Sequence, residues 1–435
     1  MTNSPPKTRE VYLIDGARTP FLKAKSTPGP FKAADLAVAA GRPLLERQPF
    51  KPSDLDEVIL GCMIPAADEA NIGRVVSLRL GCGKKVPGWT VQRNCASGMQ
   101  AVDSALKDIQ SGRANLVLAG GTEAMSHSPV MFNHGMVTWL GKWMKAKNIM
   151  QKIAAITQFR PSMLAPEIAL LKGLRDPIVG LSMGQTTEVI ADKFGITRTQ
   201  MDEYATRSHK RLAAAIDEGR LANEIEIAID GDGRYYDVDD GLRRDSSVER
   251  LAKLRSIFDR PYGKVTAGNS SQVTDGSAWC LLASEEAVKE FNLKPRAKII
   301  HCEWAGLDPR QMGLGPVHAT TPILQANNLS LKDIDYWEIN EAFAGQVLGC
   351  LAAWENDEYC QQELGLEQAM GSIDHDRLNL DGGGVSLGHP IGATGVRIIL
   401  HLLHVLENKN AKRGIATLCI GGGQGGATLI ERIEN

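Results

Sequence analysis

The sequence predicts an α/β fold that is built twice in tandem around a largely parallel sheet. Short apolar runs alternate with amphipathic helical patterns along most of its 435 residues, which is typical of strands joined by helices. A chain of this length also exceeds one ordinary hydrophobic core, so at least two domains are expected. The runs expected to form strands are 11–14, 58–60, 116–119, 298–300, 336–339 and 415–418. The patterns expected to form helices are 35–46, 96–111, 317–326 and 393–406.

Two correspondences between the halves indicate the duplication. Residues 53–59 and 332–339 each follow a helical pattern and lead into a strand. Residues 116–121 (L-V-L-A-G-G) and 417–422 (T-L-C-I-G-G) share a pattern, and a long helix precedes each of them. The common order favours a tandem duplication, and the alternative is the general likeness among all α/β chains.

A long insertion separates the two halves. It carries a basic stretch rich in Trp and Met (136–175) and an Asp-rich segment (230–245) that lacks the ligand spacing of a calcium loop. We therefore assign residues 8–132 with 265–295 to the first half, 133–264 to an inserted loop domain and 296–435 to the second half.

Charge and cysteine usage argue against several functions. The formal net charge is −2, whereas a protein that binds nucleic acid needs a basic excess. The eight cysteines are scattered and none forms a C-x-x-C pair, so we expect reduced thiols and neither a disulfide framework nor a metal site. Residues 1–9 are polar and no later apolar run is long enough to cross a bilayer, which predicts a cytoplasmic protein.

Cys95 lies where the helical pattern 96–111 begins. The free backbone N–H groups and the positive end of the helix dipole favour a thiolate at this place. Cys95 is therefore a candidate nucleophile, and a buried structural cysteine is the alternative.

Polar side chains at a strand-to-helix junction are a second signal. Asn340 and Glu341 follow the strand expected at 336–339, the usual place for functional groups in an α/β sheet. A plain helix cap formed by Asn340, with Glu341 in the first turn, is the alternative.

A glycine-rich loop holds His389. Residues 382–395 contain six glycines, so the backbone there approaches something closely or adopts positive φ. A histidine constrained in this way can take the proton from a thiol. His401 and His404 lie on the following helix and are expected to be surface or packing residues.

Cys419 ends an apolar strand and precedes glycines 421–423. The segment formally satisfies G-x-G-x-x-G, but a strand follows it where a dinucleotide site needs a helix. We therefore reject a nucleotide site. A second thiol beside backbone N–H groups freed by glycines suits a proton carrier next to an oxyanion hole.

Taken together, the four loops resemble the thiolase family. Its motifs C-x-S-G, N-E-A-F, G-H-P-x-G-A-T-G and C-x-G-G-G stand here at 95–98, 340–343, 388–395 and 419–423. The resemblance covers nearly the whole chain and implies the thiolase fold, a duplicated five-layer α-β-α-β-α architecture with an inserted loop domain. Gln92 and Ser182 replace an Asn and a His that are common in the family, and Ser182 argues against a dedicated short-chain biosynthetic enzyme.

The resemblance implies an acetyl-CoA C-acyltransferase (3-ketoacyl-CoA thiolase) of fatty-acid β-oxidation. Coenzyme A is its co-substrate, and no cofactor is permanently bound. In the implied roles Cys95 carries the acyl group, His389 takes the proton of Cys95, and Cys419 moves the proton of the departing enolate.

Further roles are implied by the same motifs. Asn340 holds a water that binds the enolate oxygen together with His389, and Glu341 orients its neighbours. The backbone N–H groups of Cys95 and Gly421 serve the second oxyanion. The implied coenzyme A contacts are Ser271, Met183 and Ala267.

Two alternatives remain for the activity. One is an acetyl-CoA C-acetyltransferase that is specific for acetoacetyl-CoA. The other is a non-catalytic lipid-binding or scaffold protein on the same fold, against which the presence of Cys95, His389 and Cys419 argues. Cys419 also argues against the related condensing synthases, which lack a second catalytic cysteine.

The basic stretch 136–175 has the profile of a partner-docking or membrane-interfacial helix, with Trp139 and Trp143 one turn apart among lysines. A cover over the coenzyme A site, with lysines serving its phosphates, is the alternative. Residues 164–167 resemble the long loop of the thiolase subunit of the trifunctional β-oxidation complex. This resemblance implies a hydratase/dehydrogenase partner subunit or a peripheral membrane contact, and the family implies a homodimer or a dimer of dimers.

Overall fold

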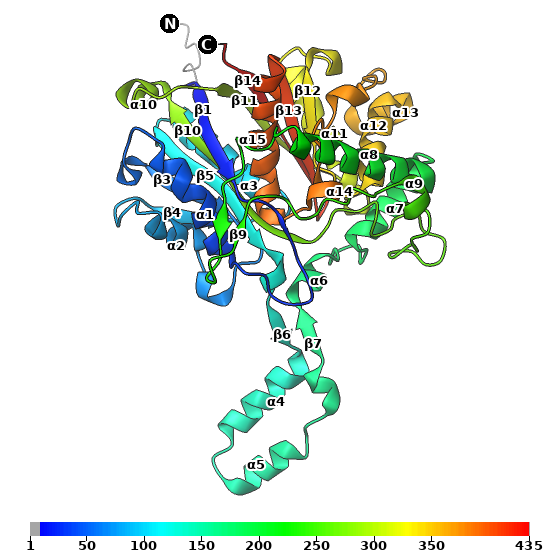
Figure 1. Ribbon diagram of the computed structural model, residues 1–435. Helices are drawn as coiled ribbons and strands as arrows, with labels where there is room; N and C mark the ends of the chain where they lie inside the picture. Colours follow the sequence, from blue (N-terminus) through cyan, green and yellow to red (C-terminus); the bar gives the residue numbers. More distant parts are fainter. Residues whose placement is uncertain (1–8, 435) are drawn as a thin grey trace, which may run out of the picture.

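The computed structural model describes residues 9–434 and contains one large mixed sheet with helices on both faces (Figure 1). Residues 1–8 and 435, which include most of the polar N-terminal segment and the outer limits of the two halves, lie outside the described residues. The strand order is β12 (Tyr336–Ile339), β13 (Arg413–Ile420), β14 (Gln424–Arg432), β11 (Ala297–Gly306), β1 (Val11–Arg18), β10 (Thr274–Ser284), β5 (Leu116–Ala124), β3 (Glu57–Gly61) and β4 (Gly88–Val91), and β2 (Leu22–Lys23) pairs with β10.

The duplication predicted from the sequence is confirmed by the strand order. The run β1-β10-β5-β3 of the first half is repeated as β11-β14-β13-β12 in the second. The pairing directions agree as well, since each run is antiparallel, antiparallel and then parallel. The two halves of the sheet meet through a short antiparallel pairing of β1 with β11.

The expectation of a largely parallel sheet is wrong. Only β3–β4, β3–β5 and β12–β13 pair in parallel, whereas the other pairings in this sheet are antiparallel. The cause is one reversing strand in each half. β14 turns back on β13 through Gly422 and Gly423, which both have positive φ, and β10 returns from the insertion to lie between β1 and β5.

Five layers follow from how the helices pack. α3 (Ser97–Gln110) and α15 (Ile391–Asn408) pack together between the two halves of the sheet and share a hydrophobic core with both. α1 (Ala33–Glu46) and α2 (Ile72–Arg79) cover the first half on its outer side. α11 (Gly315–Ala326), α12 (Ala344–Glu355) and α7 (Met183–Lys193) cover the second half. The remaining helices of the body are α8 (Arg198–Asp217), α9 (Val248–Leu251), α10 (Glu285–Glu290), α13 (Asp357–Leu364) and α14 (Gly384–Leu387).

A helical hairpin projects from the body at the lower end of Figure 1. We call residues 130–168 the α4–α5 hairpin; it comprises β6 (Val130–Phe132), α4 (His134–Lys145), α5 (Ile149–Ile156) and β7 (Pro166–Ile168), and α6 (Ala169–Gly173) follows it. Its base is closed by Asn133, whose side chain caps α4 and donates to the carbonyl oxygens of Ser162, Met163 and Ala165.

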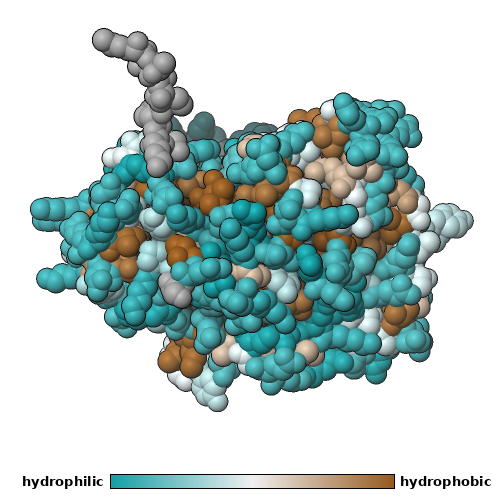
Figure 2. Space-filling view, turned by 90° about the horizontal axis from the view of Figure 1, so that it is seen from above, coloured by the Kyte–Doolittle hydropathy of each residue, from teal (hydrophilic) through white to brown (hydrophobic). Residues whose placement is uncertain are grey.

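The apolar side that the sequence predicts for this hairpin is largely exposed. Trp139 and Trp143 stack on each other, but Met144 is 83% exposed and Met150 is 72% exposed. By contrast, the face of the molecule seen from above is mostly hydrophilic (Figure 2). Within residues 9–434, none of the helices combines the length and the apolar character needed to cross a bilayer.

Candidate active site

Cys95 lies in a tight turn between β4 and α3. Asn94 adopts positive φ, its Nδ2 donates to the carbonyl oxygen of Gly421 at 2.7 Å, and its own carbonyl oxygen accepts from Ser97 Oγ at 2.8 Å. The turn that presents Cys95 is therefore tied to the turn that follows Cys419, although the two lie far apart in the sequence.

Burial decides the ionisation of Cys95. It raises the pKa of the thiol above its usual value, and the backbone N–H of Gly421 opposes this only in part. The expectation that the start of α3 favours a thiolate is thus wrong for the resting site. The thiol is neutral, so a base must remove its proton.

His389 has the protonation state of such a base. Its Nδ1 lies 2.7 Å from Thr394 Oγ1, and that hydroxyl donates its proton to the carbonyl oxygen of Pro390 at 3.0 Å. Because a hydroxyl has one proton, Thr394 must accept the hydrogen bond from Nδ1–H of His389. Nε2 of His389 then carries the lone pair, and it has no hydrogen-bond partner among the described residues.

The pKa of His389 agrees with this tautomer. Burial lowers its pKa to about 4, and the charge of Arg397 acts in the same direction. At neutral pH the imidazole is therefore uncharged and can accept a proton.

Asn340 and Glu341 lie beyond the end of β12, and neither caps a helix. The helix-cap alternative is wrong, because α12 begins only at Ala344, after Phe343. Asn340 is fully buried, yet neither its Oδ1 nor its Nδ2 has a hydrogen-bond partner among the described residues. Buried polar groups are rarely left unpaired outside functional sites, so Asn340 is suited to hold a ligand atom or water.

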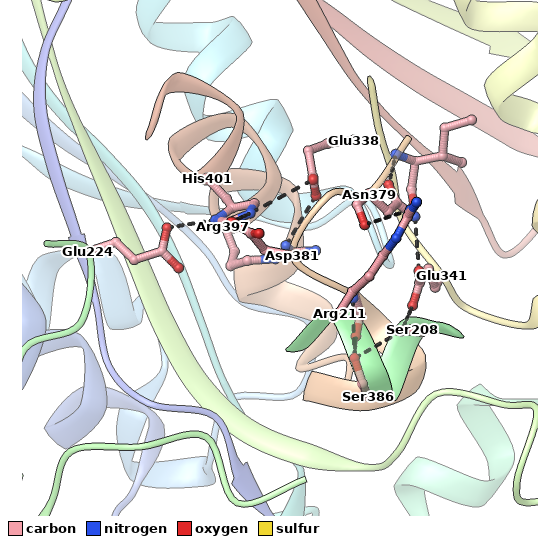
Figure 3. A network of polar contacts seen from close by, with 12 residues as sticks. Ser208, Arg211, Glu224, Glu338, Glu341, Asn379, Asp381, Ser386, Arg397 and His401 are labelled. Atoms are coloured by element: carbon pink, nitrogen blue, oxygen red, sulfur yellow. Dashed lines mark hydrogen bonds and ion pairs between the residues drawn. The ribbon is translucent and has the colours of Figure 1, made fainter. Parts of the chain in front are cut away.

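Glu341 instead is fully engaged. Its carboxylate accepts hydrogen bonds from Ser208 and Asn379 (Figure 3). It also accepts from Tyr204 and from the backbone N–H of Val385. It joins α8 to the glycine-rich loop that leads to His389, which is the geometry of a residue that orients its neighbours.

Cys419 ends β13 and is 1% exposed. Burial raises the pKa of this thiol well above its usual value, and nearby Cys95 and Cys350 add to the effect. The strand β14 follows the glycine-rich turn where a dinucleotide site would need a helix, so the rejection of a nucleotide site is confirmed. The two thiols thus lie near each other and both are neutral at rest.

Two neighbouring cavities open onto these residues. The larger, of about 590 Å³, is lined by His389, Phe343 and all three expected coenzyme A contacts, and we call it the His389 cavity. The other, of about 430 Å³, is lined by Cys95 and Gly421, and we call it the Cys95 cavity. The residues common to both linings are Leu174, Arg175, Met183 and Ile391. The hairpin helices α4 and α5 line neither cavity, whereas Leu171, Leu174 and Arg175 at the end of the stretch 136–175 line the His389 cavity.

A buried network of charges, which the sequence does not predict, lies beside the site (Figure 3). His401 Nδ1 is 2.9 Å from Glu224, and Arg397 donates to Glu338 at 3.3 Å. Burial lowers the pKa of His401, but the carboxylates of Glu224 and Glu338 outweigh it and raise the pKa to about 9. Both His401 and His404 are buried, so they are packing residues and not surface residues. The Arg397–Glu338 ion pair connects α15 to β12.

Comparisons with known proteins agree with this architecture. Two family models match the chain: "Thiolase, N-terminal domain" over residues 11–286 and "Thiolase, C-terminal domain" over 293–432. The mitochondrial trifunctional enzyme subunit beta of Bos taurus is 35% identical over 431 residues, 99% of this chain and 90% of the relative. The beta-ketoadipyl-CoA thiolase of Pseudomonas knackmussii is 39% identical over 431 residues, 98% of this chain and 100% of the relative.

A comparison with a solved structure also supports the thiolase fold. Human mitochondrial 3-ketoacyl-CoA thiolase in complex with CoA matches with a TM-score of 0.83 at 33% identity, over 98% of each chain. The fold and the family models define an acyltransferase. The chain belongs to the thiolase family.

Proposed function

We propose that the chain is an acetyl-CoA C-acyltransferase that cleaves 3-ketoacyl-CoA with free coenzyme A, as in fatty-acid β-oxidation. One observation carries the proposal. The neutral imidazole of His389 has Nε2 free to take a proton, beside a site with two neutral thiols, the partly buried Cys95 and the buried Cys419. This combination suits covalent acyl transfer with a separate proton carrier.

In the proposed first half-reaction, His389 Nε2 takes the proton of Cys95 as the sulfur attacks the 3-keto carbon. The bond between C2 and C3 then breaks, which leaves the acyl group on Cys95 as a thioester. The departing acetyl-CoA enolate takes its proton from Cys419. Water held by Asn340 and the newly formed Nε2–H of His389 would stabilise the enolate oxygen.

In the second half-reaction, the thiolate of Cys419 removes the proton of free coenzyme A. The coenzyme A sulfur attacks the acyl thioester, and the backbone N–H groups of Cys95 and Gly421 would stabilise the tetrahedral oxyanion. The Cys95 sulfur leaves and regains its proton from His389. The pantetheine chain would lie in the His389 cavity against Ser271, Met183 and Ala267, which line it.

A product assay tests this proposal. With 3-ketooctanoyl-CoA and free coenzyme A, we expect equal amounts of acetyl-CoA and hexanoyl-CoA, measured by mass spectrometry, and no turnover without free coenzyme A. Hydrolysis to free acids, or binding without turnover, would contradict it; the second outcome would favour a non-catalytic lipid-binding protein. Turnover of acetoacetyl-CoA alone would favour the acetyl-CoA C-acetyltransferase.

We also propose that the α4–α5 hairpin docks on an anionic membrane surface. Residues 130–168 contain five Lys and Arg but a single acidic residue, and exposed apolar side chains lie among them. This combination is typical of segments that lie on anionic membranes. A hydratase/dehydrogenase subunit is the alternative partner, and the same chain would form a homodimer or a dimer of dimers.

Vesicle cosedimentation tests the membrane contact. We expect the protein to sediment with anionic vesicles, and binding to fall about tenfold in Met150→Asp because an apolar side chain is replaced by a charge of the wrong sign. Ile227→Asp is the control, since Ile227 is 56% exposed but lies outside the hairpin. Equal sedimentation of the wild type with neutral and anionic vesicles, or none, would contradict the proposal.

A further inference from the structure

The Cys95 cavity is built differently from the His389 cavity. It begins at the proposed nucleophile and extends away from the expected coenzyme A contacts, none of which lines it except Met183. Its volume of about 430 Å³ falls in the range of ligand pockets, about 300–1,000 Å³. The apolar side chains of its lining are Met63, Ile64, Leu170, Leu174, Pro177, Ile178, Met183 and Ile391.

A buried acidic side chain holds each of two parts of this lining. Glu123 accepts hydrogen bonds from the backbone N–H groups of Met63 and Ile64, both at 2.9 Å. Asp176 accepts from the N–H groups of Ile178 and Val179 at 2.8 and 3.1 Å. These paired hydrogen bonds fix the backbone of both stretches, so the cavity is preformed and not a gap between loose loops.

The direction of the acyl chain follows from the reaction. Cys95 attacks the 3-keto carbon, and the coenzyme A moiety lies on one side of that carbon in the His389 cavity. The carbons beyond the 3-keto position must then extend on the other side. The Cys95 cavity is the space that adjoins the nucleophile there.

We propose that the Cys95 cavity binds a straight, uncharged acyl chain of several carbons, so that medium-chain 3-ketoacyl-CoAs are the preferred substrates. This inference rests on the proposed thiolytic activity. It distinguishes the protein from an enzyme for acetoacetyl-CoA, whose single methyl group would leave an apolar cavity of this size unfilled.

The wall chemistry disfavours a chain that ends in a carboxylate. Asp176 is 2% exposed, and its Oδ2 is buried without a hydrogen-bond partner among the described residues. A second carboxylate brought against it would be repelled. Arg175 also lines the cavity, but its side chain is exposed, and its Nε donates to the carbonyl oxygen of Gly180 at 2.9 Å.

A substrate series provides the first test. We expect kcat/KM to rise about fourfold for each added methylene from acetoacetyl-CoA to 3-ketooctanoyl-CoA, the gain from burying a methylene. We expect 3-ketohexanoyl-CoA to exceed 3-ketoadipyl-CoA, which has the same carbon number but ends in a carboxylate, by about tenfold or more. A maximum at acetoacetyl-CoA, or a preference for 3-ketoadipyl-CoA, would overturn the inference.

Variants of the lining provide the second test. Leu170→Trp fills the cavity and should lower the ratio of kcat/KM for 3-ketooctanoyl-CoA over acetoacetyl-CoA about tenfold. Leu164→Trp is the matched control, because Leu164 lies in the same segment, is 59% exposed and lines neither cavity. Asp176→Asn keeps the acceptor for Ile178 N–H but removes the charge, so it should narrow the discrimination against 3-ketoadipyl-CoA. The inference would be contradicted if Leu170→Trp left the ratio of kcat/KM for 3-ketooctanoyl-CoA over acetoacetyl-CoA unchanged and Asp176→Asn left the discrimination against 3-ketoadipyl-CoA unchanged.

Binding measurements separate this inference from the proposed function. With Cys95→Ala, calorimetry should show that the affinity for 3-ketoacyl-CoAs rises with chain length. Affinity that rises while the wild type turns over no substrate would overturn the proposed function and support the cavity assignment. Turnover by the wild type at equal kcat/KM for all chain lengths, with flat affinities, would overturn the cavity assignment and leave the function standing.

Discussion

Replacing Cys95 by alanine abolishes thiolysis and removes the acyl-enzyme. The expected loss in kcat is on the order of 10⁴-fold or more, as found when a covalent nucleophile is deleted. The reason is that the acyl group is carried as a thioester on the sulfur of Cys95 in the proposed mechanism, and alanine has no sulfur to carry it. Intact-protein mass spectrometry after incubation with 3-ketooctanoyl-CoA measures the adduct directly.

The matched control is Cys82→Ala, since Cys82 is a buried free cysteine that lines neither cavity. It should form the adduct and turn over as the wild type does. An adduct in Cys95→Ala would show that another residue is the nucleophile. Unchanged melting temperatures in both variants would exclude misfolding as the cause of lost activity.

The resting state of the site explains why the base matters so much. The pKa of Cys95 is raised by burial and that of His389 is lowered to about 4. A thiolate–imidazolium pair is therefore disfavoured before substrate binds. In the proposed mechanism the proton moves as the sulfur attacks, when the oxyanion donors would stabilise the developing charge.

The helices and the four loops that carry the catalytic motifs could be predicted from the sequence. The expected helices at 96–111 and 393–406 match α3 and α15 within two residues, because their apolar residues recur at helical spacing over a length that a strand rarely reaches. β10 could not be found in this way. All of its residues are buried, so its two faces show no alternation, and without it the sheet was expected to be largely parallel.

Within the site, residue types were predictable but their states were not. Cys95, His389 and Asn340 stand in distinctive loops, whereas the pKa of Cys95 depends on burial that only the folded chain creates. Glu123 follows two glycines inside a strand and carries no local sign that it holds the Cys95 cavity wall. His401 likewise meets Glu224 only through the tertiary fold.

Thr394 is the clearest case of a role that only the geometry reveals. Its hydroxyl donates to the carbonyl oxygen of Pro390 and accepts from His389 Nδ1–H, so it selects the tautomer in which Nε2 is a base. Thr394 touches no reacting atom in the proposed mechanism. It is a positioning residue, so we expect removal of its hydroxyl to change activity only through the tautomer of His389.

Thr394→Val, which keeps the shape but removes the acceptor, should lower kcat about 10²-fold, the size of a lost general-base contribution. Without the hydroxyl, Nδ1–H of His389 would be buried and unpaired, which costs about 1–3 kcal/mol, so the preference for the Nδ1–H tautomer would be lost and the fraction of His389 with a free lone pair on Nε2 would fall. Thr394→Ser restores the hydroxyl and should return kcat to within a few fold of the wild type. If Thr394 had only a structural role, Thr394→Val would lower the melting temperature without changing the tautomer of His389. Nitrogen NMR of His389 therefore distinguishes a structural role from selection of the tautomer. Wild-type kcat in Thr394→Val, or an unchanged Nδ1–H tautomer, would refute the assignment, because the base at Nε2 exists only while Nδ1 holds the proton.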